Sequence, residues 1–134
     1  MSKKILIIHT SWYEEYISEM LDISKKILKD FDCTSFVAPG ALELSALAKH
    51  KISNSNFIGV LFLGIVIRGE TSHYDLITRE AFRSISNLSI EKSELALINN
   101  VICVENIEQL KERLVKNTTN NAKALIQLIN EKSS

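Results

Sequence analysis

The chain is poor in proline, glycine and cysteine. Its 134 residues include one proline and four glycines, so no proline- or glycine-rich linker divides it, and we expect a single domain over residues 1–134. The two cysteines, Cys33 and Cys103, stand far apart and form no CxxC or metal-ligand spacing. We interpret both as small core residues in a reducing compartment.

The chain also lacks an excess of charge of either sign and any long apolar run. Sixteen basic residues balance sixteen acidic ones, so the net charge gives no reason to expect nucleic acid or an anionic membrane as a partner. The apolar run over residues 5–8 ends at His9 and is too short for a secretion signal. The run over residues 59–67 is too short to span a bilayer. We therefore expect a soluble, cytoplasmic protein.

What the sequence does contain is a regular alternation of two patterns. Short apolar runs rich in β-branched residues predict strands, and longer stretches with apolar residues three or four apart predict helices. The predicted strands are residues 4–9, 33–38, 57–67 and 95–104. The predicted helices are residues 17–31, 41–50, 72–89, 107–115 and 120–132.

The predicted strands are nearly continuous apolar runs, which is the pattern of strands buried on both faces. Repetition of strand and helix then predicts right-handed crossovers and an α/β fold, with a four-stranded parallel sheet and helices on both faces. Ligands bind outside the carboxyl ends of the strands in such sheets. A site is therefore expected among the residues that follow the four strands, which are residues 10–13, 39–43, 68–73 and 105–106.

The third strand end has the sequence RGETSHYD, residues 68–75. Ser72 and Asp75 have the spacing of a capping box, so a helix is expected to begin here. A helix N-terminus is a natural seat for phosphate, and its field disfavours the imidazolium form of His73. A neutral imidazole beside a bound phosphate can take up a proton and return it. A well-capped helix without any ligand explains these eight residues slightly better when they are taken alone.

Three sharper hypotheses fail at this strand end. Residues 64–71 have the spacing of a P-loop, but Glu70 stands where a lysine is required. Ser72, His73 and Asp75 are too close in sequence to form a hydrolase triad, and there is no GxSxG elbow. No further ligand cluster completes a metal site here, so no metal is expected.

The other strand ends carry residues that are suggestive but open to two interpretations. PGALE, residues 39–43, turns tightly into a helix start, where Glu43 is either a ligand-binding acid or a surface acid that complements the helix dipole. Trp12 and Tyr13 either cover a planar ring or close the end of the sheet. Arg113, on a predicted helix after the fourth strand, is either a solvated charge or a phosphate-binding fork.

Taken together, these strand-end segments form a combination that is specific enough to indicate a protein family. The order PGALE, then GIVIRGETSHYD, then VENIEQ with Arg113 four residues further on, resembles the lumazine synthase family over nearly the whole chain. The resemblance implies a flavodoxin-like three-layer sandwich and a homopentamer. It also implies a transferase of riboflavin biosynthesis that uses no metal or organic cofactor. That enzyme condenses 5-amino-6-(D-ribitylamino)uracil with 3,4-dihydroxy-2-butanone 4-phosphate, giving 6,7-dimethyl-8-ribityllumazine, phosphate and water.

The same resemblance implies which residues bind the ribitylaminouracil. Trp12 would stack on the pyrimidine, three residues of PGALE would hold the ribityl-pyrimidine, and three strand residues would line the pyrimidine edge through backbone groups. The three residues of PGALE are Ala41, Leu42 and Glu43, and the three strand residues are Ile65, Val66 and Ile67.

Five further residues are implied to serve the phosphorylated substrate and the proton transfer. Glu70 and Thr71 would contact the phosphate through their amides, and His73 would be the proton donor and acceptor. Asn99 and Arg113 would arrive from a neighbouring subunit, with Arg113 on the phosphate. The sites would then lie at subunit interfaces.

The chain departs from the family pattern in two segments. Asn99 stands where the family often has an aromatic residue, and Asn121 and Ala122 stand where it often has lysine and glycine. A catalytically degenerate relative that binds lumazine or flavin without making it is therefore the alternative hypothesis. An unrelated flavodoxin-like domain that binds FMN would need a Ser/Thr/Gly-rich phosphate loop after the first strand, and residues 9–16 form a poor one.

Overall fold

The computed structural model describes residues 3–133. The chain alternates strands with helices and includes two short 3-10 turns. Its elements are β1 (Lys4–His9), α1 (Glu14–Ile27), β2 (Asp32–Val37), η1 (Ala41–Glu43), α2 (Leu44–Ile52), β3 (Phe57–Ile67), η2 (Arg68–Glu70), α3 (Tyr74–Glu91), β4 (Ala96–Val104) and α4 (Ile107–Lys132).

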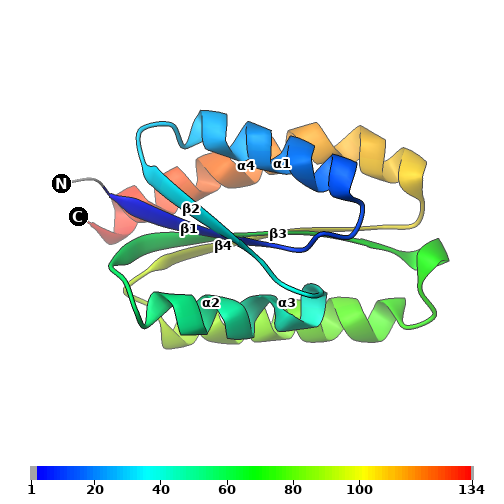
Figure 1. The fold of residues 1–134 in the computed structure, drawn as a ribbon, viewed down its shortest axis with the longest axis horizontal. Coiled ribbons are helices and arrows are strands. Elements are labelled where there is room, and N and C mark those ends of the chain that lie inside the picture. The colour runs from blue at the N-terminus through cyan, green and yellow to red at the C-terminus, as the bar shows by residue number, and fades with distance from the viewer. Residues whose placement is uncertain (1–2, 134) are drawn as a thin grey trace.

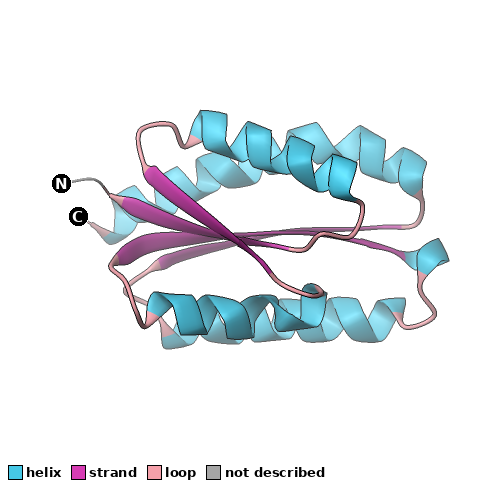
Figure 2. Ribbon diagram, in the orientation of Figure 1, coloured by secondary structure: helices cyan, strands magenta, loops and turns pink. Residues whose placement is uncertain are grey.

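The four strands form one parallel sheet in the order β2-β1-β3-β4. Helices α1 and α4 cover one face of this sheet and helices α2 and α3 cover the other (Figure 1). Figure 2 shows the resulting three layers, with the strands between two pairs of helices. The α/β fold predicted from the sequence, a four-stranded parallel sheet with helices on both faces, is confirmed.

The core lies on both faces of the sheet because the inner strands are apolar over consecutive residues, 5–8 in β1 and 57–67 in β3. In β1, Ile5 and Ile7 pack in the cluster beneath α1 and α4, while Leu6 and Ile8 pack in the cluster above α2 and α3. All four side chains are fully buried. Burial of a side chain of this size contributes about 1.5–3 kcal/mol, so the two faces together fix this strand firmly.

Helix α4 lies close against the sheet at Gly59. A Cβ at this position would come within 3.0 Å of Cδ1 of Ile129 and 3.2 Å of Cδ1 of Leu125. Glycine in β3 therefore lets the last helix approach the strand backbone more closely than any larger residue would allow.

The prediction of two separate C-terminal helices, over residues 107–115 and 120–132, is wrong, because α4 runs without a break from Ile107 to Lys132. The physical reason is one continuous buried stripe at helical spacing, in which polar Thr118 occupies a core position. The stripe consists of Leu110, Leu114, Thr118, Ala122, Leu125 and Ile129.

The predicted capping box at Ser72 and Asp75 is also wrong. Helix α3 begins at Tyr74, and its N-cap residue, His73, makes no side-chain capping bond. The carboxylate of Asp75 pairs instead with the guanidinium of Arg68, at 3.1 Å. The carboxylate of Asp75 is therefore engaged by Arg68 and does not make the capping bond back to the backbone of Ser72.

The helix predicted over residues 41–50 begins later than expected. Ala41–Glu43 forms the 3-10 turn η1, and the α-helix α2 starts only at Leu44.

Within residues 3–133, none of the helices has the length and apolar character that crossing a membrane would require.

Candidate active site

A cavity of about 520 Å³ opens at the carboxyl edge of the sheet. Its walls come from the loop after β1, the turn η1, the end of β3, the turn η2 and the first turns of α3. The residues that line it are Trp12, Tyr13, Gly40, Ala41, Leu42, Glu43, Ile65, Val66, Ile67, Glu70, Thr71 and Ile77.

Nine of the predicted site residues meet in this cavity although they come from three separate segments of the chain. They are Trp12, Ala41, Leu42, Glu43, Ile65, Val66, Ile67, Glu70 and Thr71. The parallel sheet explains their meeting, since the segments that follow β1, β2 and β3 all emerge at one edge.

The cavity has an apolar body and a few polar groups at its margin. Ile65, Val66 and Ile67 are the buried end of β3. Trp12 and Leu42 project from the loops and remain 66% and 47% exposed. Large side chains that stay open to solvent beside a cavity offer a surface on which a planar ring can stack.

Three ionisable groups face the cavity: the carboxylates of Glu43 and Glu70 and the phenol of Tyr13. Partial burial and, to a smaller extent, the negative charge of Glu70 raise the pKa of Tyr13. The phenol is therefore held in its neutral form and remains a hydrogen-bond donor. Tyr13 also has φ 62° and ψ 55°, a left-handed conformation that a bulky side chain rarely adopts.

The sequence reasoning did not place Tyr13, Gly40 or Ile77 in the binding set. Tyr13 lies in the expected strand-end segment 10–13 and, with Trp12, was interpreted as either covering a planar ring or closing the end of the sheet. Gly40 lies within PGALE, and a Cβ there would meet Oε1 of Glu43 at 3.0 Å. Ile77 lies one turn into α3 and carries no signal in the sequence that separates it from an ordinary core residue.

His73 lies beside the cavity but is not among the residues that line it. Its side chain is exposed at the N-terminus of α3. Its backbone N–H donates to Oγ1 of Thr71 at 3.2 Å, and its carbonyl accepts from the N–H of Ile77 at 2.9 Å. The backbone of His73 is thus bonded to Thr71 and Ile77, two residues that line the cavity.

Asn99 and Arg113 lie away from the cavity of their own chain. Asn99 pairs with Phe62 in the sheet, three residues before the level of Ile65, and its Oδ1 accepts from the N–H of Val101 at 2.8 Å. Arg113 is exposed on α4, on the opposite face of the sheet from η1 and α3. Their contribution to a neighbouring site stays a prediction.

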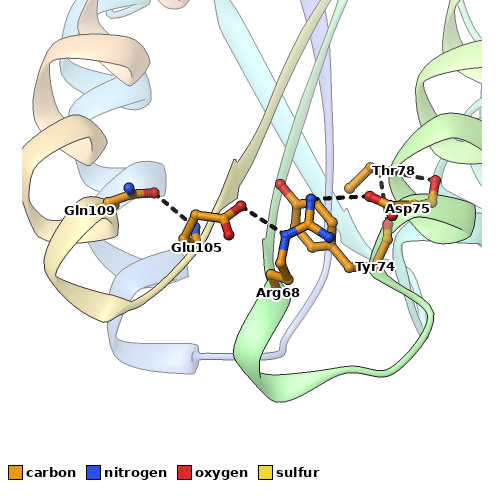
Figure 3. Close-up of polar contacts among 6 residues, drawn as sticks. All are labelled: Arg68, Tyr74, Asp75, Thr78, Glu105 and Gln109. Carbon is orange, nitrogen blue, oxygen red and sulfur yellow. Dashed lines mark hydrogen bonds and ion pairs between the residues drawn. The ribbon is translucent and has the colours of Figure 1, made fainter.

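Arg68 is fixed by two carboxylates and one ring (Figure 3). Its Nε donates to Oε2 of Glu105 at 2.9 Å and its Nη2 lies 3.1 Å from Oδ1 of Asp75. The guanidinium also lies over the ring of Tyr74, at 4.2 Å from the centroid. The hydrogen bonds to Glu105 and Asp75 raise the pKa of Arg68 above its ordinary value.

No three His, Cys, Asp or Glu side chains come together as a metal centre would require, as far as residues 3–133 are concerned. The ionisable residues that line the cavity are Glu43, Glu70 and Tyr13. Carboxyl groups and phenols are among the groups that donate and accept protons in enzymes.

The parallel sheet and the cavity at its carboxyl edge define an α/β protein of flavodoxin-like architecture with a pocket sized for a small organic molecule. The chain belongs to the 6,7-dimethyl-8-ribityllumazine synthase family, whose model matches residues 2–133.

Sequence comparison finds several relatives that carry this name. The 6,7-dimethyl-8-ribityllumazine synthase 1 of Rhizobium meliloti (strain 1021) is 36% identical over 112 residues, covering 78% of this chain and 72% of that protein. The synthase of Limosilactobacillus reuteri (strain DSM 20016) is 30% identical over 115 residues, covering 84% and 75%. That of Methylobacillus flagellatus is 33% identical over 101 residues, covering 75% and 67%.

Proposed function

We propose that this chain is a transferase of riboflavin biosynthesis. It condenses 5-amino-6-(D-ribitylamino)uracil with 3,4-dihydroxy-2-butanone 4-phosphate and releases 6,7-dimethyl-8-ribityllumazine, phosphate and water. The observation that carries this proposal is the meeting of PGALE, the end of β3 and the segment after it around one cavity that Trp12 overhangs. Membership of the lumazine synthase family supports the same reaction.

The pyrimidine is assigned to the part of the cavity between Trp12 and the end of β3. The indole is exposed above an apolar floor, which suits stacking on a planar heterocycle. Ala41, Leu42 and Glu43 form the turn η1 on the other side, where the carboxylate of Glu43 can accept hydrogen bonds from ribityl hydroxyls.

The phosphate is assigned to the segment from Glu70 to the start of α3. The first turn of this 18-residue helix leaves backbone N–H groups unpaired and carries a positive partial charge. Glu70 and Thr71 would bind the phosphate through their amides, and His73, two residues further on, would move the proton. In this assignment the acid–base group would stand beside the leaving phosphate.

We further propose a homopentamer with sites at subunit interfaces, acting in the cytoplasm. Asn99 and Arg113 lie outside the cavity of their own chain, so a complete site needs them from a neighbour. The two free cysteines suit a reducing compartment. Sedimentation should show a stable oligomer, and a monomer that still turns over would contradict this assignment.

The reaction itself is tested by mixing the purified chain with both substrates and following the fluorescence of the lumazine product. We expect turnover that depends on both substrates and saturates with each. Binding of the pyrimidine without any product would contradict the proposed reaction and indicate a binding protein instead. A matched sample of boiled protein measures the uncatalysed background.

A further inference from the structure

The segment that carries the phosphate-side residues has few bonds of its own. Between β3 and α3, the N–H of Thr71 donates to the carbonyl of Arg68 at 3.4 Å, and the N–H of His73 donates to Oγ1 of Thr71 at 3.2 Å. Both bonds are long, and Gly69, Glu70 and His73 are exposed. The carbonyl of His73 accepts from the N–H of Ile77 at 2.9 Å, which joins the end of the segment to α3. Residues 69–72 make fewer bonds, so contacts from neighbouring elements help to set their position.

Arg68 ties the segment to two other elements. Its guanidinium reaches Glu105, which follows β4, and Asp75, in the first turn of α3. The same group lies over the ring of Tyr74. These side chains stay exposed, at 46% for Arg68, 52% for Glu105 and 74% for Asp75, so each pair alone is weak. Two pairs and a stacked ring acting on one planar guanidinium together narrow its range of orientations. We call Arg68, Tyr74, Asp75 and Glu105 the Arg68 cluster.

The partners of Arg68 are themselves held in place (Figure 3). The N–H of Glu105 donates to Oε1 of Gln109 at 2.8 Å, and the N–H of Gln109 donates to Oδ1 of Asn106, the N-cap of α4, at 2.9 Å. Gly69 lies against the same connection, since a Cβ on it would be 3.7 Å from the carbonyl oxygen of Glu105. The β4–α4 connection therefore forms a fixed support for the segment after β3.

The charges argue against a direct phosphate contact by Arg68. One guanidinium faces two carboxylates, so the cluster carries a net negative charge. Two of the guanidinium nitrogens already face those carboxylates, at 2.9 and 3.1 Å. Arg68 also lies outside the set of residues that line the cavity. A phosphate would therefore meet the repulsion of two carboxylates that already neutralise this guanidinium.

We propose that Arg68 is a positioning residue for the phosphate half of the site. Anchored to Glu105 and Asp75, it sets the position of Glu70, Thr71 and His73 relative to the pyrimidine side of the cavity. This inference rests on the proposed function. A misplacement of about 1 Å in a reacting group can cost up to about a hundredfold in rate, so an anchor outside the cavity can still govern turnover.

The experiment compares Arg68→Met and Glu105→Gln with a matched control, Arg83→Met, which removes an exposed arginine of α3 that pairs with Glu80 at 3.3 Å. We expect Arg68→Met to raise the KM for the butanone phosphate about tenfold and to lower kcat, with the KM for the uracil changed by less than about twofold. Glu105→Gln should act in the same direction with a smaller effect, and the two changes together should be less than additive. Arg83→Met should match the unsubstituted chain.

One outcome separates positioning from direct binding. If Arg68 held the phosphate itself, Glu105→Gln would free the guanidinium and lower the KM for the butanone phosphate, which would overturn the proposal. Arg68→Lys should restore only part of the loss, because an ammonium cannot span both carboxylates as a planar fork does.

Amide hydrogen exchange gives a readout that does not depend on turnover. We expect peptides covering residues 69–73 to exchange several-fold faster in Arg68→Met than in Arg83→Met. Unchanged exchange there, together with unchanged kinetics, refutes the anchoring role. If the unsubstituted chain makes no lumazine, the proposed function fails, while the exchange comparison still decides whether Arg68 orders this segment.

Discussion

The side-chain amide of Asn100 donates from Nδ2 to Oγ1 of Thr118 at 3.0 Å, in the contact between β4 and the middle of α4. Asn100 is 2% exposed and Thr118 is fully buried. The amide of Asn121 completes the group by donating to Oδ1 of Asn100 at 2.7 Å. This network fixes the register of the longest helix against an edge strand.

Thr118→Val tests that network, since it keeps the shape of the side chain and removes the acceptor. The buried amide of Asn100 would lose its partner, so we expect the free energy of unfolding to fall by about 1–3 kcal/mol, measured by urea denaturation. The control is Thr119→Val at the next, half-buried position, where a change within about 0.5 kcal/mol is expected. Equal effects at both positions would show that the network adds nothing to stability.

The left-handed backbone of Tyr13 predicts an unusual order of two variants. Tyr13→Gly and Tyr13→Ala both remove the ring, so their difference reports on the backbone alone. Because alanine pays a steric cost in this conformation and glycine does not, the glycine variant should be more stable by about 1 kcal/mol. At Tyr16, inside α1, the order should reverse, since alanine is the better helix former by about 1 kcal/mol. The midpoints of urea denaturation of the four variants give the order of stability at each position.

His73→Ala tests the proton-transfer role. General acid–base catalysis contributes about 10²–10⁴-fold, most of it expected in kcat, and the condensation proceeds slowly without a catalyst. We therefore expect a slow but measurable enzyme with KM values close to those of the unsubstituted chain. Steady-state kinetics with fluorescence detection give both constants. A kcat that stays within twofold of the original would remove His73 from the catalytic assignment.

Arg113→Ala tests the residue that the proposed oligomer supplies from a neighbour. A guanidinium that binds the phosphate group both in the bound substrate and while the phosphate departs should affect both KM and kcat. We expect a higher KM for the butanone phosphate and a lower kcat, with little change for the uracil. Arg113→Lys should recover only part, because it replaces a bidentate fork by a point charge. If KM and kcat for the butanone phosphate are unchanged in Arg113→Ala, Arg113 does not bind the phosphate. The segment at the start of α3 would then bind it alone.

Burial raises the pKa of the Cys103 thiol from 9.0 to about 11. A raised pKa means that the folded protein favours the thiol, so the reactive thiolate at pH 8 should be about a hundredfold scarcer than for an ordinary cysteine. In Cys33→Ser protein, the rate of reaction with a disulfide reagent should keep rising with pH beyond 9 and level off only near 11. The urea-unfolded chain is the control and should level off near pH 9. A rate that levels off near pH 9 in the folded protein as well would contradict the raised pKa of Cys103.

Much of the site could be predicted because its residues follow strands that the sequence makes obvious. Phe57–Ile67 is apolar throughout, so both its bounds and its burial were predicted, and the motif that follows had to lie at the sheet edge. Tyr13 and Gly40 lie in the strand-end segments 10–13 and 39–43 where a site was expected, but neither was assigned to binding, and Ile77 was missed. Their place in the cavity depends on how three loops fold toward one another.

The helix ends show where local patterns mislead. Ser72 and Asp75 have the spacing of a capping box, yet Asp75 pairs with Arg68 because a fixed guanidinium lies within 3.1 Å. Two separate helices were predicted over residues 107–115 and 120–132, yet α4 continues between them. In both places a specific side-chain contact, Arg68 with Asp75 and Asn100 with Thr118, outweighed a weak local preference.

The sequence by itself determined the α/β class, the four strands and the family motifs, since these depend on apolar runs and on residue order. Only the tertiary structure decided that Arg68 turns to Glu105, 37 residues away, that Thr118 meets Asn100, and that His73 stands at the rim while Tyr13 faces the cavity. Such pairings depend on the close packing of whole elements, and no local periodicity encodes which side chains will meet when those elements pack.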